Sequence, residues 1–158
     1  MAGEDLTAGG EATAGGSPTA DDTARRAEAL RAEALRARYR STLGAVPPGA
    51  EDRLRVARTF DRLPTEEAFM ALRHLVLTDS PLGARVQQLV HFGQLLALGR
   101  PAPARIHARG ALHAGAGLAE LVGVAETALI TAGAPAYALG IEIVTELLAA
   151  AEEAERVR

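Results

Sequence analysis

Apolar residues recur every three or four positions along most of this chain, a spacing that gathers them on one face of an α-helix. No segment alternates apolar and polar residues convincingly over the length of a strand. The pattern therefore predicts an all-α domain, in which helices bury their apolar faces against one another. The helices we expect cover residues 24–43, 51–60, 64–77, 86–98, 103–114, 118–132 and 135–157.

Glycine and proline mark the expected helix ends. Gly44 follows the first helix, and Gly99-Arg100-Pro101 separates two later ones. Gly115 and Gly133-Ala134-Pro135 do the same further along the chain. Gly tolerates the left-handed backbone that often follows a last turn, and Pro fits a first turn. The helices between residues 86 and 132 are predicted to form the core.

The first 20 residues are mostly Gly, Ala, Thr, Ser and Glu, which bury too little apolar surface to offset the entropy cost of ordering. We expect residues 1–20 to be a disordered tail and residues 21–158 to be a single all-helical domain. Asp21, Asp22 and Thr23 offer caps for the first helix. Its narrow apolar stripe suits a solvated helix docked through one seam, or a helix that binds a partner.

The composition excludes several kinds of chemistry. The 158-residue chain contains no Cys, which removes disulfides, thiolate metal sites and thiol redox reactions. All 17 basic residues are Arg, so Schiff-base chemistry on a lysine is impossible. The net charge of −3 gives no bulk attraction to nucleic acid. Heavy use of Ala, Arg and Gly is typical of a GC-rich genome, such as that of an actinobacterium.

No targeting or membrane segment is expected. The N-terminus, Met1 to Asp5, has neither the basic region nor the apolar region of a signal peptide. The best apolar run, Leu89 to Leu98, has about half the length that a bilayer requires. We therefore expect a cytoplasmic protein with no membrane partner.

Candidate chemistry gathers between Leu89 and Pro135, where three of the four histidines lie. They are His91, His107 and His113. An ordinary imidazole titrates near neutral pH and so suits proton transfer. The spacing fits no standard zinc motif, and phosphate loops, dinucleotide fingerprints and nucleophile elbows are absent from the sequence. We predict that the site uses no metal and no cofactor.

The motifs around His107 resemble the carboxymuconolactone decarboxylase family. The match covers about residues 82–150. The segments that carry it are Leu95 to Pro101, His107-Ala108-Arg109, Ala114-Gly115, Ala119-Glu120-Leu121 and Ala132 to Ala136, and Arg38 to Gly44 is similar to the family's N-terminal helix.

This resemblance implies an all-helical, alkylhydroperoxidase D-like fold that assembles as a homo-oligomer, a trimer or a hexamer. Relatives with peroxidase activity use a Cys-x-x-Cys pair, which this chain lacks. The decarboxylase branch works without a cofactor on a small-molecule carboxylic acid or lactone. Its substrate loses carbon dioxide while electrons move onto a conjugated carbonyl, so the site needs a cation, an enolate donor and an acid.

By the resemblance, His107 is the first catalytic candidate, because it could donate to the enolate oxygen or deliver the proton. His91 and His113 are further catalytic candidates. Arg109 could hold a carboxylate with paired donors. Each residue also has a structural interpretation: a packing histidine for His107, a backbone-bonded histidine for His91, a helix-end residue for His113 and an intersubunit ion pair for Arg109. The candidate substrate-binding residues are Arg109, Arg85 and Glu120.

The chain departs from the family pattern at several polar positions. Gly123 stands where the family has a second Glu, and Thr131 where it has Tyr. His113 replaces a common Asn, His91 a small polar residue, and Val86-Gln87 the family's Thr-Arg. Such changes indicate a site rebuilt for another substrate, or a lost one.

Two functional hypotheses follow. The first is an acid–base enzyme that decarboxylates, isomerises or cyclises a carbonyl-containing acid, such as a polyketide-type biosynthetic intermediate. The second is a catalytically inactive oligomeric scaffold or small-molecule binding module. Convergence of His91, His107 and His113 on one pocket would favour the enzyme.

Overall fold

The computed structural model describes residues 19–157, which form seven α-helices and no strand. The predicted all-α class is confirmed. The helices are α1 (Ala20–Leu43), α2 (Pro48–Thr59), α3 (Leu63–Leu77), α4 (Gly83–Ala97), α5 (Pro101–His113), α6 (Leu118–Ala132) and α7 (Ala134–Arg156).

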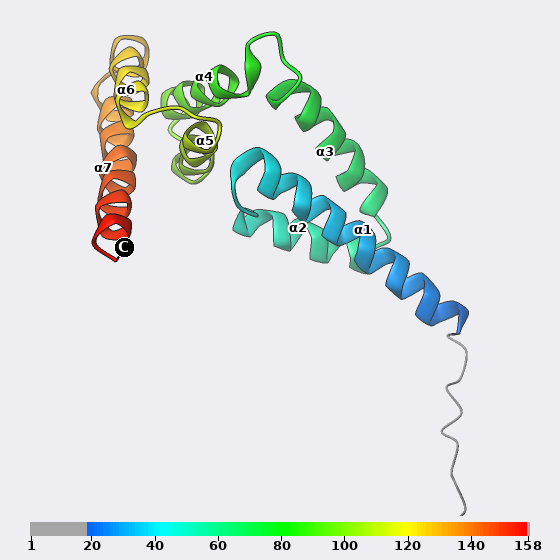
Figure 1. Ribbon diagram of the computed structural model, residues 1–158. Coiled ribbons are helices and arrows are strands. Elements are labelled where there is room, and N and C mark those ends of the chain that lie inside the picture. The colour runs from blue at the N-terminus through cyan, green and yellow to red at the C-terminus, as the bar shows by residue number, and fades with distance from the viewer. Residues whose placement is uncertain (1–18, 158) are drawn as a thin grey trace, which may run out of the picture.

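The helices form a layered array in which α4 and α5 occupy the middle (Figure 1). On one side α6 packs along α7, and on the other side lie α1, α2 and α3. One apolar cluster is centred on Phe92 and Leu121 and joins α4 to α7. A second, centred on Tyr39 and Leu54, joins α1 to α3. The α4–α5 layer therefore lies where the two clusters meet, and the division into one domain and a tail stays a prediction.

The start of α1 differs from the prediction. Thr19 caps the helix: its Oγ1 accepts the Asp22 N–H at 3.1 Å, and the Asp22 carboxylate accepts the Thr19 N–H at 3.2 Å. These reciprocal bonds satisfy donors that a helix start otherwise leaves free. The helix thus begins at Ala20, so the predicted start at Ala24 and the predicted disorder of residues 19–20 are wrong. The rest of the predicted tail, residues 1–18, lies outside the described residues.

The apolar character of α7 is greater than the sequence pattern predicts. By length and composition α7 could cross a membrane, with a mean hydropathy of 1.4 in its most apolar window, of which 17% is buried. Its apolar residues form no uninterrupted run because Glu142 and Glu146 lie among them. Both carboxylates pair with Arg105 of α5, and α7 packs along α6, which are contacts that suit a bundle helix.

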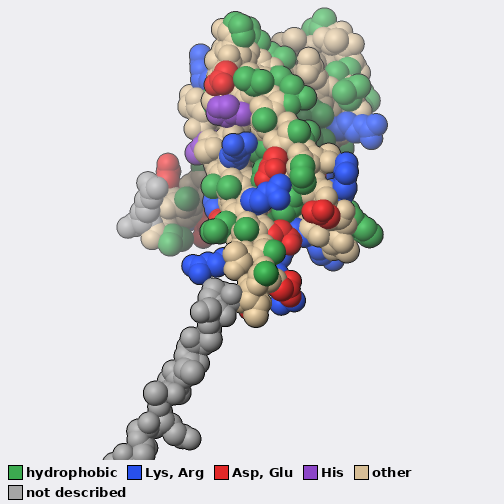
Figure 2. Space-filling model, turned by 90° about the vertical axis from the view of Figure 1, so that its right-hand side faces the viewer, with side chains coloured by type: hydrophobic (Ala, Val, Ile, Leu, Met, Phe, Trp, Pro, Cys, Tyr) green, Lys and Arg blue, Asp and Glu red, His purple; other side chains and the backbone are tan. Residues whose placement is uncertain are grey.

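Apolar side chains remain exposed on other helices as well. Leu72 and Leu75 on α3 are 59% and 60% exposed, and Ile130 on α6 is 87% exposed. Figure 2, which views the molecule from the side of α1 and α3, shows hydrophobic side chains among the charged ones. Such surface favours the predicted homo-oligomer, which stays a prediction.

Close contact between α6 and α7 depends on one glycine. A Cβ added at Gly140 would lie 2.5 Å from the Cβ of Ala125 and 3.0 Å from Cδ1 of Leu96. Both distances are at or below the limit for carbon atoms. The helix axes therefore approach to a separation that only Gly allows at this position.

We expect Gly140→Ala to lower the free energy of unfolding by about 1–3 kcal/mol, because overpacking outweighs the gain in helix propensity of about 1 kcal/mol. Chemical denaturation would measure the change. The matched control is Gly123→Ala on α6, where an added Cβ meets nothing within 4 Å. That substitution should stabilise the protein by about 0.5–1 kcal/mol. Equal effects of the two substitutions would contradict the close approach.

Candidate active site

Two histidines stack where α4 packs along α5. The ring centroids of His91 and His107 lie 4.7 Å apart, and the ring planes make an angle of 25°. His107 is 6% exposed, whereas His91 is half-buried. The pair therefore joins an enclosed imidazole to one that reaches solvent.

A buried glutamine fixes the orientation of His107. The Nδ1 atom of His107 lies 2.7 Å from Oε1 of Gln88, which is fully buried. At its other end Gln88 donates from Nε2 to the carbonyl oxygen of Thr42, at 3.3 Å. That carbonyl can only accept, so the amide nitrogen lies on its side and Oε1 faces the imidazole. His107 must then carry its hydrogen on Nδ1, which leaves a lone pair on Nε2 when the ring is neutral.

A glycine makes room for this arrangement. A Cβ at Gly110 would lie 2.9 Å from Oε1 of Gln88 and 3.1 Å from Cδ2 of Leu43. Gly110 lies one turn after His107 on α5, so the glycine lets the Gln88 amide reach across α5. The side chain of Gln88 is thus held by packing as well as by its two hydrogen bonds.

Burial and positive charge keep both rings neutral. Burial, followed by the charges of His91 and Arg73, lowers the pKa of His107 to about 4. Burial and Arg73 also lower the pKa of His91. A neutral imidazole can accept a proton at Nε2. The hydrogen bond from its Nδ1 to Gln88 holds the ring in place. This is the arrangement of an oriented general base.

The comparisons with known proteins identify the family. The sequence model of the family described as "Carboxymuconolactone decarboxylase family" matches residues 64–146, more than half of the chain. The chain belongs to this family. It is also similar to a crystal structure from Burkholderia xenovorans LB400, provisionally named a carboxymuconolactone decarboxylase, with a TM-score of 0.68 and 21% identity over 83% of this chain and 98% of that one. At this identity the likeness shows the fold alone. No curated protein matches significantly.

The region that matches the family model includes the stacked histidines and Gln88 but not Thr42. It includes α3, α4 and α5, which carry Arg73, Gln88, His91 and His107. Thr42, which holds the Gln88 amide, lies before it on α1. The orientation of His107 therefore depends on a segment outside the matched region.

Of the three predicted catalytic histidines, only two meet. His113 ends α5 on the far side of Gly110, where its Nε2 lies 3.2 Å from the carbonyl oxygen of Ser41. Its ring packs on Gly44, because a Cβ there would lie 3.2 Å from Nδ1 of His113. Convergence of three imidazoles on one pocket is therefore not observed. The catalytic roles of His91 and His107 stay predictions.

Two of the three predicted substrate-binding residues pair with each other. Arg85 and Glu120 form an ion pair with each other, and Glu120 accepts the N–H of Gly117 at 3.0 Å. This backbone bond, followed by Arg85, lowers the pKa of Glu120. Glu120 thus caps α6. Arg109 lies exposed on α5. Whether any of the three binds substrate stays a prediction.

Sequence reasoning missed Gln88, Thr42 and Arg73. Gln88 lies one turn before His91 and shares the buried face of α4 with Phe92 and Leu96, so a polar residue in register with core positions was the available signal. Arg73 likewise interrupts the apolar side chains of α3. Nothing in the local sequence indicates that the Thr42 carbonyl is used, because it comes from a distant helix end.

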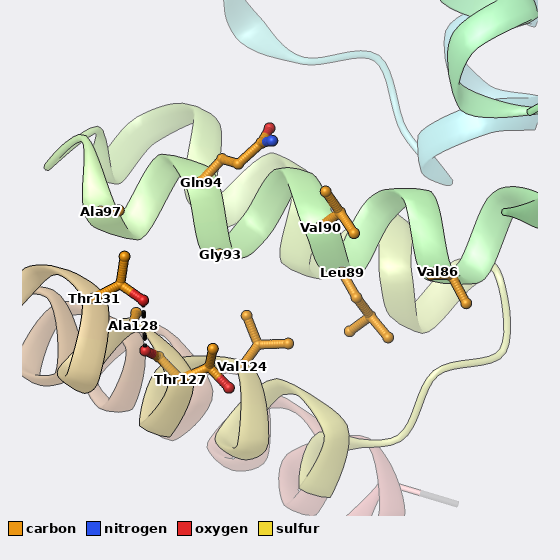
Figure 3. A pocket seen from close by; sticks show the side chains of 10 residues that line it. All are labelled: Val86, Leu89, Val90, Gly93, Gln94, Ala97, Val124, Thr127, Ala128 and Thr131. Atoms are coloured by element: carbon orange, nitrogen blue, oxygen red, sulfur yellow. Dashed lines mark hydrogen bonds between the residues drawn. The ribbon is translucent and has the colours of Figure 1, made fainter.

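An apolar groove lies on another face of α4 (Figure 3). Its volume is about 370 Å³, and neither His91 nor His107 lines it. Thr131, which stands where the family has Tyr, reaches this groove and donates from Oγ1 to the Thr127 carbonyl oxygen at 3.1 Å. The lining residues are Val86, Leu89, Val90, Gly93, Gln94 and Ala97 of α4, and Val124, Thr127, Ala128 and Thr131 of α6.

We expect Gln88→Leu to lower the free energy of unfolding by about 1–2 kcal/mol, because the substitution leaves a buried donor on His107 and the Thr42 carbonyl without partners. Chemical denaturation would measure the loss. The control is Gln94→Leu, which changes an exposed glutamine on the same helix and should alter stability by less than about 0.5 kcal/mol. An unchanged free energy of unfolding in Gln88→Leu would show that Gln88 does not hydrogen-bond His107 and Thr42.

Proposed function

We propose that this protein catalyses proton transfer at carbon, without a cofactor, on a small carbonyl-containing acid, in a decarboxylation or an isomerisation. The observation that carries the proposal is the neutral His107, whose Nδ1 is tied to Gln88 at 2.7 Å and whose Nε2 keeps its lone pair. Family membership supports the same chemistry. The departures at Gly123 and Thr131 favour a substrate other than the family's aromatic-catabolism lactone, such as a polyketide-type intermediate.

In an isomerisation, Nε2 of His107 removes a proton from the carbon next to the carbonyl. The electron pair of that C–H bond moves onto the carbonyl oxygen, and the imidazolium returns the proton at another carbon of the conjugated system. In a decarboxylation, the bond to the carboxylate breaks, carbon dioxide leaves, and its electron pair forms the enolate. Nε2 then passes a proton from water to carbon.

His91 would assist this transfer from the solvent side. Its half-buried ring stacks on His107 at 4.7 Å, so a proton or a polar substrate group reaching His107 from solvent passes close to it. A bound carboxylate would also favour the charged form of both rings, because an opposite charge nearby raises the pKa of an imidazole. Substrate would thereby prepare the rings to hold the proton that they transfer.

We also propose that the protein acts as a homo-oligomer, a trimer or a hexamer, in the cytoplasm. The exposed apolar side chains of α3, α6 and α7 support assembly.

The experiment is a turnover screen in D₂O with 4-carboxymuconolactone and a panel of conjugated keto acids and aromatic polyketide acids. Release of carbon dioxide and incorporation of deuterium at carbon would be measured for the wild type and for His107→Asn. The proposal predicts turnover of at least one acid, with deuterium entering the product, and little above the protein-free blank for His107→Asn. No turnover of any acid would contradict it.

The second candidate function is a catalytically inactive scaffold or small-molecule binding module. The observation that favours it is that Glu120, a predicted substrate-binding residue, caps α6 and pairs with Arg85, which is a second one. In that case the same screen would show binding of an acid without deuterium exchange.

A further inference from the structure

Small residues hollow the surface between α4 and α6. The lining of this groove includes Gly93, Ala97 and Ala128, which Figure 3 shows among the larger side chains of the two helices. A Cβ added at Gly93 would lie 3.0 Å from Cγ1 of Val124, so a larger residue there would fill the hollow. The groove of about 370 Å³ therefore exists because α4 is narrow where it faces α6.

The groove suits an uncharged, apolar occupant. None of the ten residues that line it is charged. The hydroxyls of Thr127 and Thr131 donate to carbonyl oxygens of their own helix, at 2.9 and 3.1 Å, so their hydrogens are already used. Arg85, which precedes the groove on α4, is paired with Glu120. A charged group placed in the groove would lose its hydration without gaining a partner.

Two large apolar side chains project into solvent at one end of the groove. Ile130 is 87% exposed and lies one turn after Thr127 on α6. Leu98 is 69% exposed and follows Ala97 of the groove. Figure 3 shows Ala97 and Thr131 at this same end. The chain thus presents an uncharged projection beside an uncharged hollow on a single face, and the two match in charge and in polarity.

We propose that Ile130 of one copy of this chain enters the α4–α6 groove of a second copy, while Ile130 of the second copy enters the groove of the first. A projection that lies next to its own hollow is self-complementary about a twofold axis, because each copy then offers both halves of the contact. The inference rests on the homo-oligomer of the proposed function and names one of its contacts.

The size of this face indicates which oligomer it serves. Two helices, each about 10 Å wide and followed for about 20 Å, present roughly 400 Å² in projection. A standard interface buries about 800 Å² on each partner, so a stable assembly needs a second contact elsewhere on the chain. A trimer contains no twofold axis. The contact therefore selects the hexamer, in which it joins two trimers.

Sedimentation velocity of the full chain measures the assembly. We expect the wild type to sediment as a hexamer and Ile130→Glu as a trimer, because the glutamate would lose its hydration inside the groove. Thr131→Tyr, which places a ring at the groove, should weaken the same contact at least about tenfold. The matched control is Leu30→Glu on α1, which changes a side chain that is 65% exposed and should leave the hexamer intact.

A disulfide cross-link locates the contact without adding charge. The chain has no Cys, so an introduced thiol has no competitor. Tagged Ile130→Cys, mixed with untagged Ala97→Cys or Val90→Cys and mildly oxidised, should form a disulfide between copies with at least one of these groove positions. Leu30→Cys mixed with Ala97→Cys should not.

The outcomes separate the proposals. Unchanged sedimentation of Ile130→Glu, or no cross-link to either groove position, would overturn this contact and leave the homo-oligomer in place. A monomeric or trimeric wild type would also overturn it. If a monomeric wild type bound the neutral probe N-phenyl-1-naphthylamine and Thr131→Tyr did not, the groove would belong to a small apolar ligand instead. The proposed catalysis is judged separately, by the deuterium screen of the wild type and His107→Asn.

Discussion

Between pH 6.5 and pH 4 the wild-type protein should lose about 3 kcal/mol of unfolding free energy that His107→Asn does not lose. The reason is that burial, with the charges of His91 and Arg73, lowers the pKa of His107 to about 4 in the folded protein. An unfolded chain exposes the same imidazole to water, where its pKa is about 6.5.

The sign follows from which state binds the proton first. Above pH 6.5 the ring is neutral in both states, so its contribution to stability is complete. As the pH falls below 6.5, the His107 imidazole takes up a proton in the unfolded chain but not in the folded one. This stabilises the unfolded state and lowers the free energy of unfolding. The loss ends near pH 4, where the folded protein also takes up the proton. The lowered pKa of His91 acts in the same direction.

The measurement is urea unfolding at intervals from pH 8 to pH 4 for both proteins. Asn suits the comparison because its amide places a donor close to where Nδ1 of His107 lies, so it keeps the bond to Gln88 without titrating. The pKa values of Glu120 and Glu146 are lowered in the folded state, so their contribution to stability is lost as the pH falls and they become protonated. This loss is the same in both proteins and cancels in the comparison. Parallel pH profiles would show that His107 is not held neutral by burial.

The second large effect concerns turnover. With any acid that the wild type converts, His107→Asn should reduce kcat by about 10²–10⁴-fold, the usual contribution of a positioned general base or acid. The substitution removes Nε2 but keeps the donor toward Gln88, so the fold should persist. A rise in KM with kcat unchanged would instead indicate that His107 binds substrate without transferring a proton.

Gln88→Leu provides the graded comparison. It retains Nε2 of His107 but removes the acceptor that fixes its tautomer, so kcat should fall by about 10–100-fold, as for other residues that orient a catalytic histidine. Arg100→Gln, distant in role and exposed, should retain full turnover. Equal loss in Gln88→Leu and His107→Asn would indicate that both act through the fold.

Much of the fold follows from local sequence. The three-to-four residue spacing gives the helices, and Gly44, Gly99, Gly115 and Gly133 mark ends because each adopts a positive φ that other residues avoid. The Thr19 cap was missed because its partner is an Asp rather than the Glu or Gln of the usual pattern. The extent of α7 was predicted to within one residue at each end, but its apolar character was underestimated because Glu142 and Glu146 interrupt the apolar run.

The site was less accessible to sequence reasoning. The resemblance leads to His107, and His91 lies on the neighbouring helix with a spacing that allows contact. Which nitrogen of His107 carries the hydrogen depends on Gln88 and on Thr42, 46 residues earlier in the chain than Gln88. The missing hydrogen-bond partner of the buried Arg73 Nε likewise depends on which side chains the neighbouring helices place around it. Both are properties of the tertiary packing, so no local pattern encodes them.

The central claim is that His107 is a neutral imidazole with its hydrogen on Nδ1 and a bare Nε2. A long-range ¹H–¹⁵N correlation spectrum of the histidine side chains at pH 7, with His107 assigned from His107→Asn, tests it most directly. We predict a single Nδ1–H tautomer that persists down to about pH 4 and is lost in Gln88→Leu. A charged ring at pH 7, or hydrogen on Nε2, would contradict the claim.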